Sequence, residues 1–238
     1  MIALLSVILI SYLVGSIPSS VWVGKLMKGI DVREHGSGNA GATNTFRVLG
    51  WQSGVIVVVI DFIKGFSTTF WISRLVWDAS IFPDGPISPP GWEAEAFLQI
   101  VCGFTAMVGH MYPLYASFRG GKGVLTACGM LYGIEPVSIS ISTATFLILM
   151  FTTRYVSLAS IIGSFLYPMG LIVLRYVFGW NIDGSIIIFG ALAALGIIIK
   201  HRANIKRLLS GTESRASFGS SKKAPETESE PVLEEVEA

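Results

Sequence analysis

Long apolar stretches alternate with short polar segments along most of the chain. The apolar stretches cover residues 1–24, 54–76, 96–118, 124–153, 155–174 and 184–199. Because a bilayer core about 30 Å thick needs roughly 20 apolar residues per helix, each stretch predicts at least one membrane-spanning helix. The stretch 124–153 is long enough for two short helices, which we expect to turn at Glu135-Pro136, since proline disfavours helix at the residue before it. The pattern therefore predicts an all-α, polytopic membrane protein with about seven transmembrane helices.

Composition supports this class of protein. Of the 238 residues, 52% are hydrophobic and 14% are charged, and the mean hydropathy is +0.64, whereas soluble domains carry about 25% charged residues. Two stretches are weaker candidates, because 54–76 is interrupted by Asp61 and Lys64 and 184–199 is short. The first stretch lacks the basic region of a secretory signal and is longer than its apolar core, so we expect it to remain as the first helix.

Lysine and arginine gather at one end of the expected spans. The positive side holds Lys25, Lys28, Arg33, Arg47, Arg119, Lys122, Arg154, Arg202, Lys206 and Arg207. The opposite side holds Asp78, Asp84, Glu93, Glu95, Glu135 and Asp183, with Arg74 and Arg175 as exceptions. Because cytoplasmic loops are enriched in Lys and Arg, this distribution predicts an outside N-terminus and a cytoplasmic C-terminus.

The last segment of the chain differs in character from the rest. We expect one integral membrane domain over residues 1–213 and a disordered, acidic cytoplasmic tail over 214–238, where glutamate, serine and proline replace the apolar residues. Cys102 and Cys128 lie in apolar stretches, which indicates packing rather than a disulfide or thiol metal site. The three histidines are scattered without a nearby carboxylate pair, so no metal site is expected.

A first polar cluster follows the first apolar stretch. It reads Gly36-Ser37-Gly38-Asn39-Ala40-Gly41-Ala42-Thr43-Asn44-Thr45-Phe46-Arg47. Small residues let backbone N–H groups approach a ligand and arginine adds a fixed positive charge, so the cluster predicts a phosphate site. The alternative is that the small residues serve helix packing and asparagine caps a helix. A polar ligand is the simpler interpretation, because so many donors are costly at a membrane surface without a partner.

A second polar cluster reads Phe118-Arg119-Gly120-Gly121-Lys122-Gly123. A Walker motif requires Ser or Thr directly after the lysine, but Gly123 follows Lys122, so nucleotide hydrolysis is not supported. A glycine-rich turn that opens a helix can still hold a phosphate through backbone amides and the lysine ammonium group. Both clusters fall on the expected cytoplasmic side.

Several other polar residues have two interpretations. Asp61 and Lys64 lie on one helix face, where a structural ion pair and a direct substrate contact are equally reasonable. In the closing segment, His201 and Asn204 share a face with Leu208, while the basic residues there are also typical of a cytoplasmic anchor. His35 and His110 are expected to be hydrogen-bonding residues rather than catalysts.

Several motifs in one order resemble those of the bacterial membrane-integral acyl phosphate:glycerol-3-phosphate acyltransferases. The likeness extends to Glu213 and is carried by the first cluster, Asp61-Phe62-Ile63-Lys64-Gly65, Gly109-His110 with Gly120-Gly121-Lys122-Gly123-Val124, Ser157 and Ser160, and residues 201–213. The resemblance implies a seven-helix protein of the bacterial cytoplasmic (inner) membrane with its active site facing the cytoplasm. It implies transfer of a fatty acyl group from acyl phosphate to the sn-1 hydroxyl of glycerol 3-phosphate, giving lysophosphatidic acid and phosphate.

The motifs and the resemblance together give the candidate site. By similarity, Ser37, Arg47, Lys122, Ser160, His201 and Asn204 would line the phosphate site. Of these, the expected catalytic residues are Ser37, Arg47, Lys122, His201 and Asn204. The expected substrate-binding residues are Asn39, Thr43, Asn44, Lys64, His110, Gly120, Gly121, Gly123, Ser157, Ser160, Arg207 and Glu213. The expected partners are glycerol 3-phosphate, a fatty acyl phosphate and membrane lipid, with no cofactor, metal or nucleic acid.

The chemistry leaves two mechanisms and two other function classes open. Acyltransferases that use thioesters commonly have Asp five positions after His, but Ala40, Tyr115 and Lys206 stand at these positions here. The substrate phosphate can then serve as proton acceptor, and the rival mechanism is a covalent ester on Ser37. A transporter of a phosphate ester is the alternative function, although it would need polar helices that reach both faces. A purely structural lipid-binding membrane protein is the other, although it would not need so many Asn, Ser and Gly residues at basic turns. The acyl-chain preference and the oligomeric state stay open.

Overall fold

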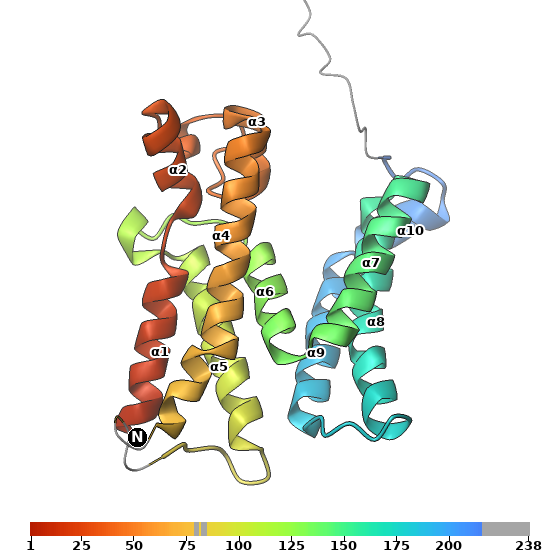
Figure 1. Cartoon of the computed structure of the whole chain (residues 1–238). Helices are drawn as coiled ribbons and strands as arrows, with labels where there is room; N and C mark the ends of the chain where they lie inside the picture. The colour runs from red at the N-terminus through yellow and green to blue at the C-terminus, as the bar shows by residue number, and fades with distance from the viewer. Residues whose placement is uncertain (79–80, 82–84, 216–238) are drawn as a thin grey trace, which may run out of the picture.

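The computed structural model describes residues 1–78, 81 and 85–215, and these residues form helices and loops without a β-strand (Figure 1). The α-helices are α1 (Ile2–Gly15), α2 (Ser19–Lys28), α3 (Ala42–Leu49), α4 (Trp51–Phe70), α5 (Ala94–Met111), α6 (Val124–Ile134), α7 (Pro136–Thr153), α8 (Val156–Tyr176), α9 (Gly184–Lys200) and α10 (Arg202–Leu209). Short 3-10 helices are η1 (Val32–Glu34), η2 (Ile72–Trp77) and η3 (Leu114–Ala116). The all-α prediction is confirmed. Asp84 and the expected tail from residue 216 onward lie outside the described residues.

Five helical segments of the described chain are long and apolar enough to cross a membrane. They are Ile2–Lys28, Trp51–Trp77, Ala94–Ala116, Pro136–Thr153 and Val156–Tyr176. A sixth span results if α9 and α10, which meet at an angle of 59°, are counted together. Helix α6 is apolar but has only 11 residues, about half of the length that a bilayer requires. The protein is therefore a multi-pass membrane protein, and the expected number of seven membrane helices stays a prediction.

The turn at Glu135-Pro136 is present, but the two helices that it joins are unequal. The expectation of two short helices is wrong for α7, which has 18 residues. Glu135 ends α6, and its carboxylate accepts hydrogen bonds from the backbone N–H groups of Val137 at 2.7 Å and Ser138 at 2.6 Å. Glu135 thus caps the N-terminus of α7 from a buried position, whereas we expected it among the charges of the outer side.

Glycines set the closest helix contacts. A Cβ atom at Gly65 of α4 would collide with the carbonyl oxygen of Thr126, and one at Gly129 of α6 would collide with that of Phe62. Helices α1 and α5 meet in the same way at Gly109, where a Cβ atom would collide with the backbone of α1. Small residues are typical of such interfaces in membranes, because they let helix backbones approach each other.

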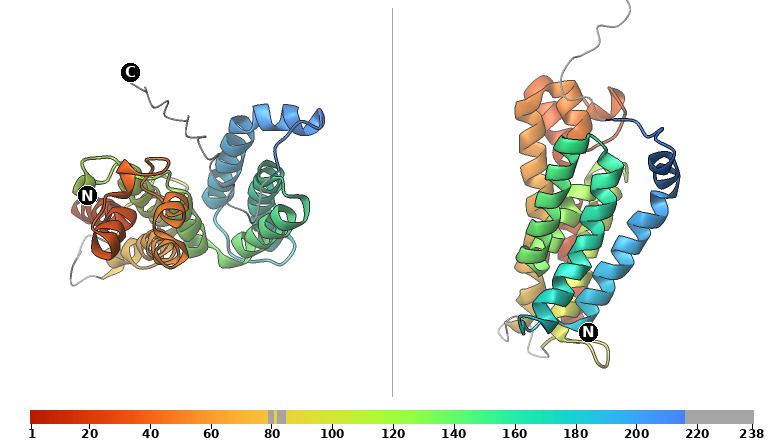
Figure 2. Two further views of the ribbon diagram at one scale, coloured as in Figure 1. Left: turned by 90° about the horizontal axis from the view of Figure 1, so that it is seen from above. Right: turned by 90° about the vertical axis from the view of Figure 1, so that its right-hand side faces the viewer.

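Helices α7 to α10 lie beside the group formed by α1 to α6 (Figures 1 and 2). A buried apolar cluster joins the two groups, with Ala96 from α5, Ile139 from α7, Leu171 from α8 and Ile186 from α9. Helices α2 and α3 lie at the end of the molecule opposite Met1, and α10 also lies away from Met1 (Figure 1). The loop between α2 and α3, which carries the first polar cluster, is therefore at the end remote from the N-terminus.

Candidate active site

The first polar cluster forms a compact loop that leads into α3. Gly36 and Gly38 have φ angles of +62° and +71°, a conformation that favours glycine. A Cβ atom at Gly36 would also collide with the side-chain oxygen of Asn44. The loop therefore turns back onto the first turn of α3, which brings Ser37 beside Asn44.

Asn44 holds this loop from within the protein. Its Nδ2 group donates to the carbonyl oxygens of Val32 at 2.8 Å and His35 at 3.0 Å. Its Oδ1 atom accepts from the backbone N–H of Ser37 at 2.8 Å and from the Ser37 hydroxyl at 3.2 Å. The side chain is 1% exposed and both ends of the amide are engaged. Asn44 is thus placed to organise the loop that presents Ser37.

The second polar cluster folds back onto the end of α5. The backbone N–H groups of Gly120 and Gly121 donate to the carbonyl oxygens of Met111 and His110, each at 3.2 Å. A Cβ atom at Gly120 would collide with the His110 carbonyl oxygen, and one at Gly121 with the His110 ring. We expected these amides to face a phosphate, but in this structure both are bonded within the chain. The two glycines instead let the loop pack directly against His110 at the end of α5, and Lys122 follows immediately after them.

The two loops line a single cavity of about 520 Å³. Its walls are Ser37, Asn39, Gly41, Ala42, Thr43, Asn44, Phe46, Arg47, Val58, Asp61, His110, Lys122, Gly123, Val124 and Leu125. Arg47 from α3 and Lys122 from the second loop place two cations on its wall, and α6 begins there with its N-terminal turn. Helix N-termini and cations both favour anions. We call this space the first cavity.

Buried ionisable residues lie at one wall of the first cavity. The Lys64 ammonium group is 2.9 Å from Asp61 Oδ1, donates to the carbonyl oxygen of Ile17 at 2.9 Å and lies 3.0 Å from His110 Nδ1. The Ser19 hydroxyl donates to Asp61 Oδ1 at 2.5 Å. Asp61 and Lys64 are 1% and 3% exposed. Of the two interpretations offered for this pair, the structure shows the ion pair, and only Asp61 and His110 reach the cavity wall.

The closing segment forms a different polar site. A second cavity of about 320 Å³ is lined by Val156, Ser157, His201, Asn204, Glu213, Ser214 and Arg215. Glu213 accepts hydrogen bonds from Asn204 Nδ2 at 2.8 Å, Ser157 Oγ at 2.7 Å and Arg207 Nε at 2.6 Å. These bonds, that of Asn204 above all, lower the pKa of Glu213 to about 2. The hydrogen-bond donors of Ser157, Asn204 and Arg207 are therefore already bonded to a charged carboxylate of the protein itself.

The predicted site residues are thus divided between two cavities with no lining residue in common. Ser37, Asn39, Thr43, Asn44, Arg47, His110, Lys122 and Gly123 line the first cavity, and Ser157, His201, Asn204 and Glu213 line the second. Four further predicted residues contact the lining residues without lining a cavity themselves. Lys64, Gly120 and Gly121 contact His110 of the first cavity, and Arg207 bonds Glu213 of the second. Ser160 lines neither, and its hydroxyl donates to the carbonyl oxygen of Val156 in its own helix at 2.9 Å.

Some lining residues were not among the predicted site residues. The apolar side chains of Phe46, Val58 and Leu125 border the first cavity, but in the sequence they look like any other apolar residues of a membrane helix. Asp61 also reaches the wall, and its charge inside an apolar stretch was a signal that could have included it.

Comparisons with known proteins agree over most of the chain. A family model described as glycerol-3-phosphate acyltransferase matches residues 5–211. The glycerol-3-phosphate acyltransferase of Salinibacter ruber is 44% identical over 211 residues, which cover 89% of this chain and 91% of the relative. That of Chlorobium limicola is 42% identical over 238 residues, which cover 92% of this chain and 99% of the relative.

Two solved structures are similar to the whole fold. They are crystal structures of PlsY (YgiH), an integral membrane glycerol 3-phosphate acyltransferase. The glycerol 3-phosphate form has a TM-score of 0.64 and 36% identity, covering 90% of this chain and 96% of that chain. The lysophosphatidic acid form has a TM-score of 0.63 and 35% identity, covering 90% and 95%. With its membrane helices, its cation-lined cavity and these relatives, the chain belongs to the glycerol-3-phosphate acyltransferase family.

Proposed function

We propose that the protein transfers a fatty acyl group from acyl phosphate to the sn-1 hydroxyl of glycerol 3-phosphate, giving lysophosphatidic acid and phosphate. Family membership supports the acceptor and the acyl transfer. The observation that carries the site is the first cavity, in which Arg47 of α3 and Lys122 of the second loop line one space. Two fixed cations beside a helix N-terminus suit a substrate phosphate.

The surroundings of this cavity suit a substrate that is part phosphate and part lipid. Phe46, Val58 and Leu125 add an apolar border next to the two cations. Asp61 lies ten residues along α4, which places this wall about 15 Å from the start of the helix. A cavity that reaches this far along a membrane helix can receive an acyl chain from the lipid side while the phosphate stays near the polar end.

The contacts of Ser37 favour the substrate phosphate as proton acceptor. The Ser37 hydroxyl donates to an amide oxygen of Asn44 at 3.2 Å, and an amide does not act as a general base. A nucleophilic serine needs an adjacent base. An acyl phosphate already carries a good leaving group, so positioning of the two substrates and stabilisation of developing charge can supply most of the rate. Ser37 then serves as a hydrogen-bonding residue of the phosphate site.

We place the active site at the cytoplasmic side of the bacterial inner membrane. The loops of the first cavity carry Arg33, Arg47, Arg119 and Lys122, and cytoplasmic loops are enriched in Lys and Arg. With α6 counted as a short seventh membrane helix, the N-terminus lies outside and the C-terminus inside. In this proposal His201 and Asn204 take part in the same reaction and bind the acyl phosphate at the second cavity.

The test is phosphate release by purified, detergent-solubilised protein given palmitoyl phosphate, with and without glycerol 3-phosphate. Release that requires the acceptor and yields 1-acyl lysophosphatidic acid supports the proposal. A trapped acyl-enzyme with ping-pong kinetics would instead support the ester on Ser37. If no release occurs and vesicles carry glycerol 3-phosphate across the membrane, the transporter replaces this proposal.

A further inference from the structure

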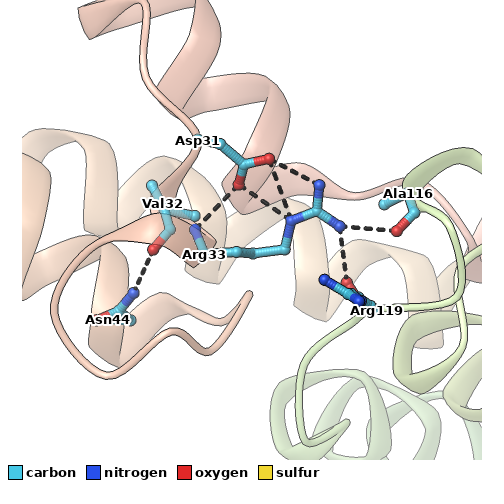
Figure 3. Close-up of polar contacts among 6 residues, drawn as sticks. All are labelled: Asp31, Val32, Arg33, Asn44, Ala116 and Arg119. Atoms are coloured by element: carbon cyan, nitrogen blue, oxygen red, sulfur yellow. Dashed lines mark hydrogen bonds and ion pairs between the residues drawn. The ribbon is translucent and has the colours of Figure 1, made fainter.

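One arginine outside the first cavity connects the two loops that form it. Arg33 follows Val32 in η1, and its Nη1 group donates to the carbonyl oxygen of Ala116 at 2.7 Å and to that of Arg119 at 3.3 Å (Figure 3). These acceptors lie 83 and 86 residues further along the chain. Arg33 is not among the residues that line the cavity. Its contacts therefore join the loops without reaching the space between them.

Asp31 fixes the guanidinium group in this position. Arg33 Nη2 donates to Asp31 Oδ2 at 2.7 Å, and Arg33 Nε donates to Oδ1 at 3.0 Å, so the pair is bidentate (Figure 3). The backbone N–H of Arg33 also donates to Asp31 Oδ1 at 3.0 Å. The two side chains are only 22% and 14% exposed. Because the arginine stabilises its charge, the pKa of the Asp31 carboxyl is lowered. We call Asp31 and Arg33 the loop clasp.

On one side the loop clasp holds the turn that leads to Lys122. Ala116 and Arg119 enclose Ser117 and Phe118, whose φ angles are +55° and +58°. Such angles are uncommon outside glycine and cost free energy, so they persist where surrounding contacts fix the backbone. Two carbonyl oxygens of this turn accept from one guanidinium group. Lys122 follows three residues after Arg119, so the position of its ammonium group depends on this turn.

On the other side the loop clasp continues into the first polar cluster. The Val32 carbonyl oxygen, directly before Arg33, accepts from Asn44 Nδ2 at 2.8 Å (Figure 3). Asn44 in turn accepts from Ser37 and belongs to α3, the helix that carries Arg47. A continuous series of hydrogen bonds therefore runs from the turn before Lys122 to the loop of Ser37.

We propose that Arg33 is a positioning residue that sets the separation of Lys122 from Ser37 and Arg47 before glycerol 3-phosphate binds. The inference rests on the proposed function, since it takes these three residues as the phosphate site. Two loops held at a fixed separation need not be ordered by the ligand, so the affinity for the phosphate benefits from the preformed arrangement. Because the residues that Arg33 positions are taken to bind glycerol 3-phosphate, while His201 and Asn204 are assigned to the acyl phosphate, its loss acts on acceptor binding more than on the acyl donor.

The experiment compares Arg33→Lys and Arg33→Gln with the unchanged protein in detergent. Lysine keeps the charge but lacks the planar fork that bonds a carboxylate and two carbonyl oxygens together. We expect both variants to raise the KM for glycerol 3-phosphate about tenfold, with the KM for acyl phosphate and the melting temperature nearly unchanged. Asp31→Asn, which leaves the contacts of Arg33 with the second loop possible, should give a smaller increase.

Arg74→Gln is the matched control. Arg74 also bonds a carboxylate, Glu95 at 2.6 Å, and a backbone carbonyl oxygen, that of Phe70, but it does so on an exposed surface away from the cavity. Its loss should leave both KM values unchanged. Full restoration of KM by Arg33→Lys would overturn the proposal in favour of a charge effect. A fall in melting temperature with an unchanged KM for glycerol 3-phosphate would also overturn it.

Calorimetric binding of glycerol 3-phosphate separates this inference from the choice of donor. If the unchanged protein fails to use palmitoyl phosphate, the proposed donor is wrong, but the affinities of the variants for glycerol 3-phosphate still test the loop clasp. Weaker binding by Arg33→Gln than by Arg74→Gln supports it. Equal affinity in these two variants overturns it whatever the donor.

Discussion

Arg47 of α3 and Lys122 of the second loop are both cations on the wall of the first cavity. Both side chains would bind the same substrate phosphate, so removal of either one should leave that phosphate with a single positively charged partner. We expect Arg47→Ala and Lys122→Ala each to lower kcat/KM by about 100-fold or more, with the melting temperature in detergent unchanged. Lys28→Ala, an exposed cation at the same end of the molecule, is the control. Near-normal turnover in either site variant would refute a shared phosphate site.

Asn44 should behave differently from these cations. Its replacement by alanine leaves the carbonyl oxygens of Val32 and His35 and the N–H of Ser37 without their partner inside the protein. We expect Asn44→Ala to lower the free energy of unfolding by about 2 kcal/mol, seen as a lower melting temperature. Thr43→Ala, next to it on the cavity wall, should leave the melting temperature unchanged. A stable Asn44→Ala protein with a raised KM would make Asn44 a substrate ligand.

At the residue scale, the sequence predicts which segments are polar more readily than what each side chain does. Ser37, Arg47 and Lys122 line one cavity, whereas Ser160, His201 and Asn204, which were expected at the same phosphate site, do not. Asn44 and Lys64, which were expected to bind substrate, instead donate hydrogen bonds to backbone carbonyl oxygens of the protein. A sequence shows that a buried polar residue needs hydrogen-bonding partners. Whether those partners are substrate or backbone atoms depends on which loops, distant in the sequence, fold next to that residue.

At the scale of helices, the close contact of α4 with α6 depends on glycine. Gly129 lies where a Cβ atom would meet the carbonyl oxygen of Phe62 and the backbone N of Phe66. We expect Gly129→Ala to separate the helices and to lower the free energy of unfolding by about 1–3 kcal/mol. Gly196→Ala in α9 is the matched control, because no atom lies within 4 Å of its added Cβ. Equal melting temperatures for the two variants would show that α4 and α6 can part without loss.

Helix positions follow closely from the apolar stretches, and the exceptions have physical reasons. The Glu135-Pro136 turn was predictable because proline ends a helix before it. The same stretch, 124–153, divided at this turn, also gives the unequal lengths of α6 and α7, so the expectation of two short helices overlooked the position of the proline within the stretch. The bend of 59° between α9 and α10 was not expected from the sequence, and beyond it Asn204 of α10 donates to Glu213.

At the scale of the whole molecule, the orientation in the membrane can be tested directly. A background with Cys102→Ala and Cys128→Ala would carry either Lys28→Cys, at the end of α2, or Glu93→Cys, directly before α5. An impermeant maleimide applied to intact spheroplasts should label only the second protein, because the positive end should be cytoplasmic. Permeabilisation should make the first protein reactive. The reverse labelling pattern would place the active site outside.

The buried pair Asp61–Lys64 has a consequence for how the chain is made. A charged residue that enters hydrocarbon alone is costly by several kcal/mol, but these two lie three residues apart and neutralise each other within one helix. Their further partners, Ser19 and the Ile17 carbonyl, belong to a span that is synthesised earlier. By the time a ribosome delivers α4 to the bilayer, its docking partner is therefore already in place. His110, which lies 3.0 Å from the Lys64 ammonium group, is synthesised after the pair and is the last of these residues to become available.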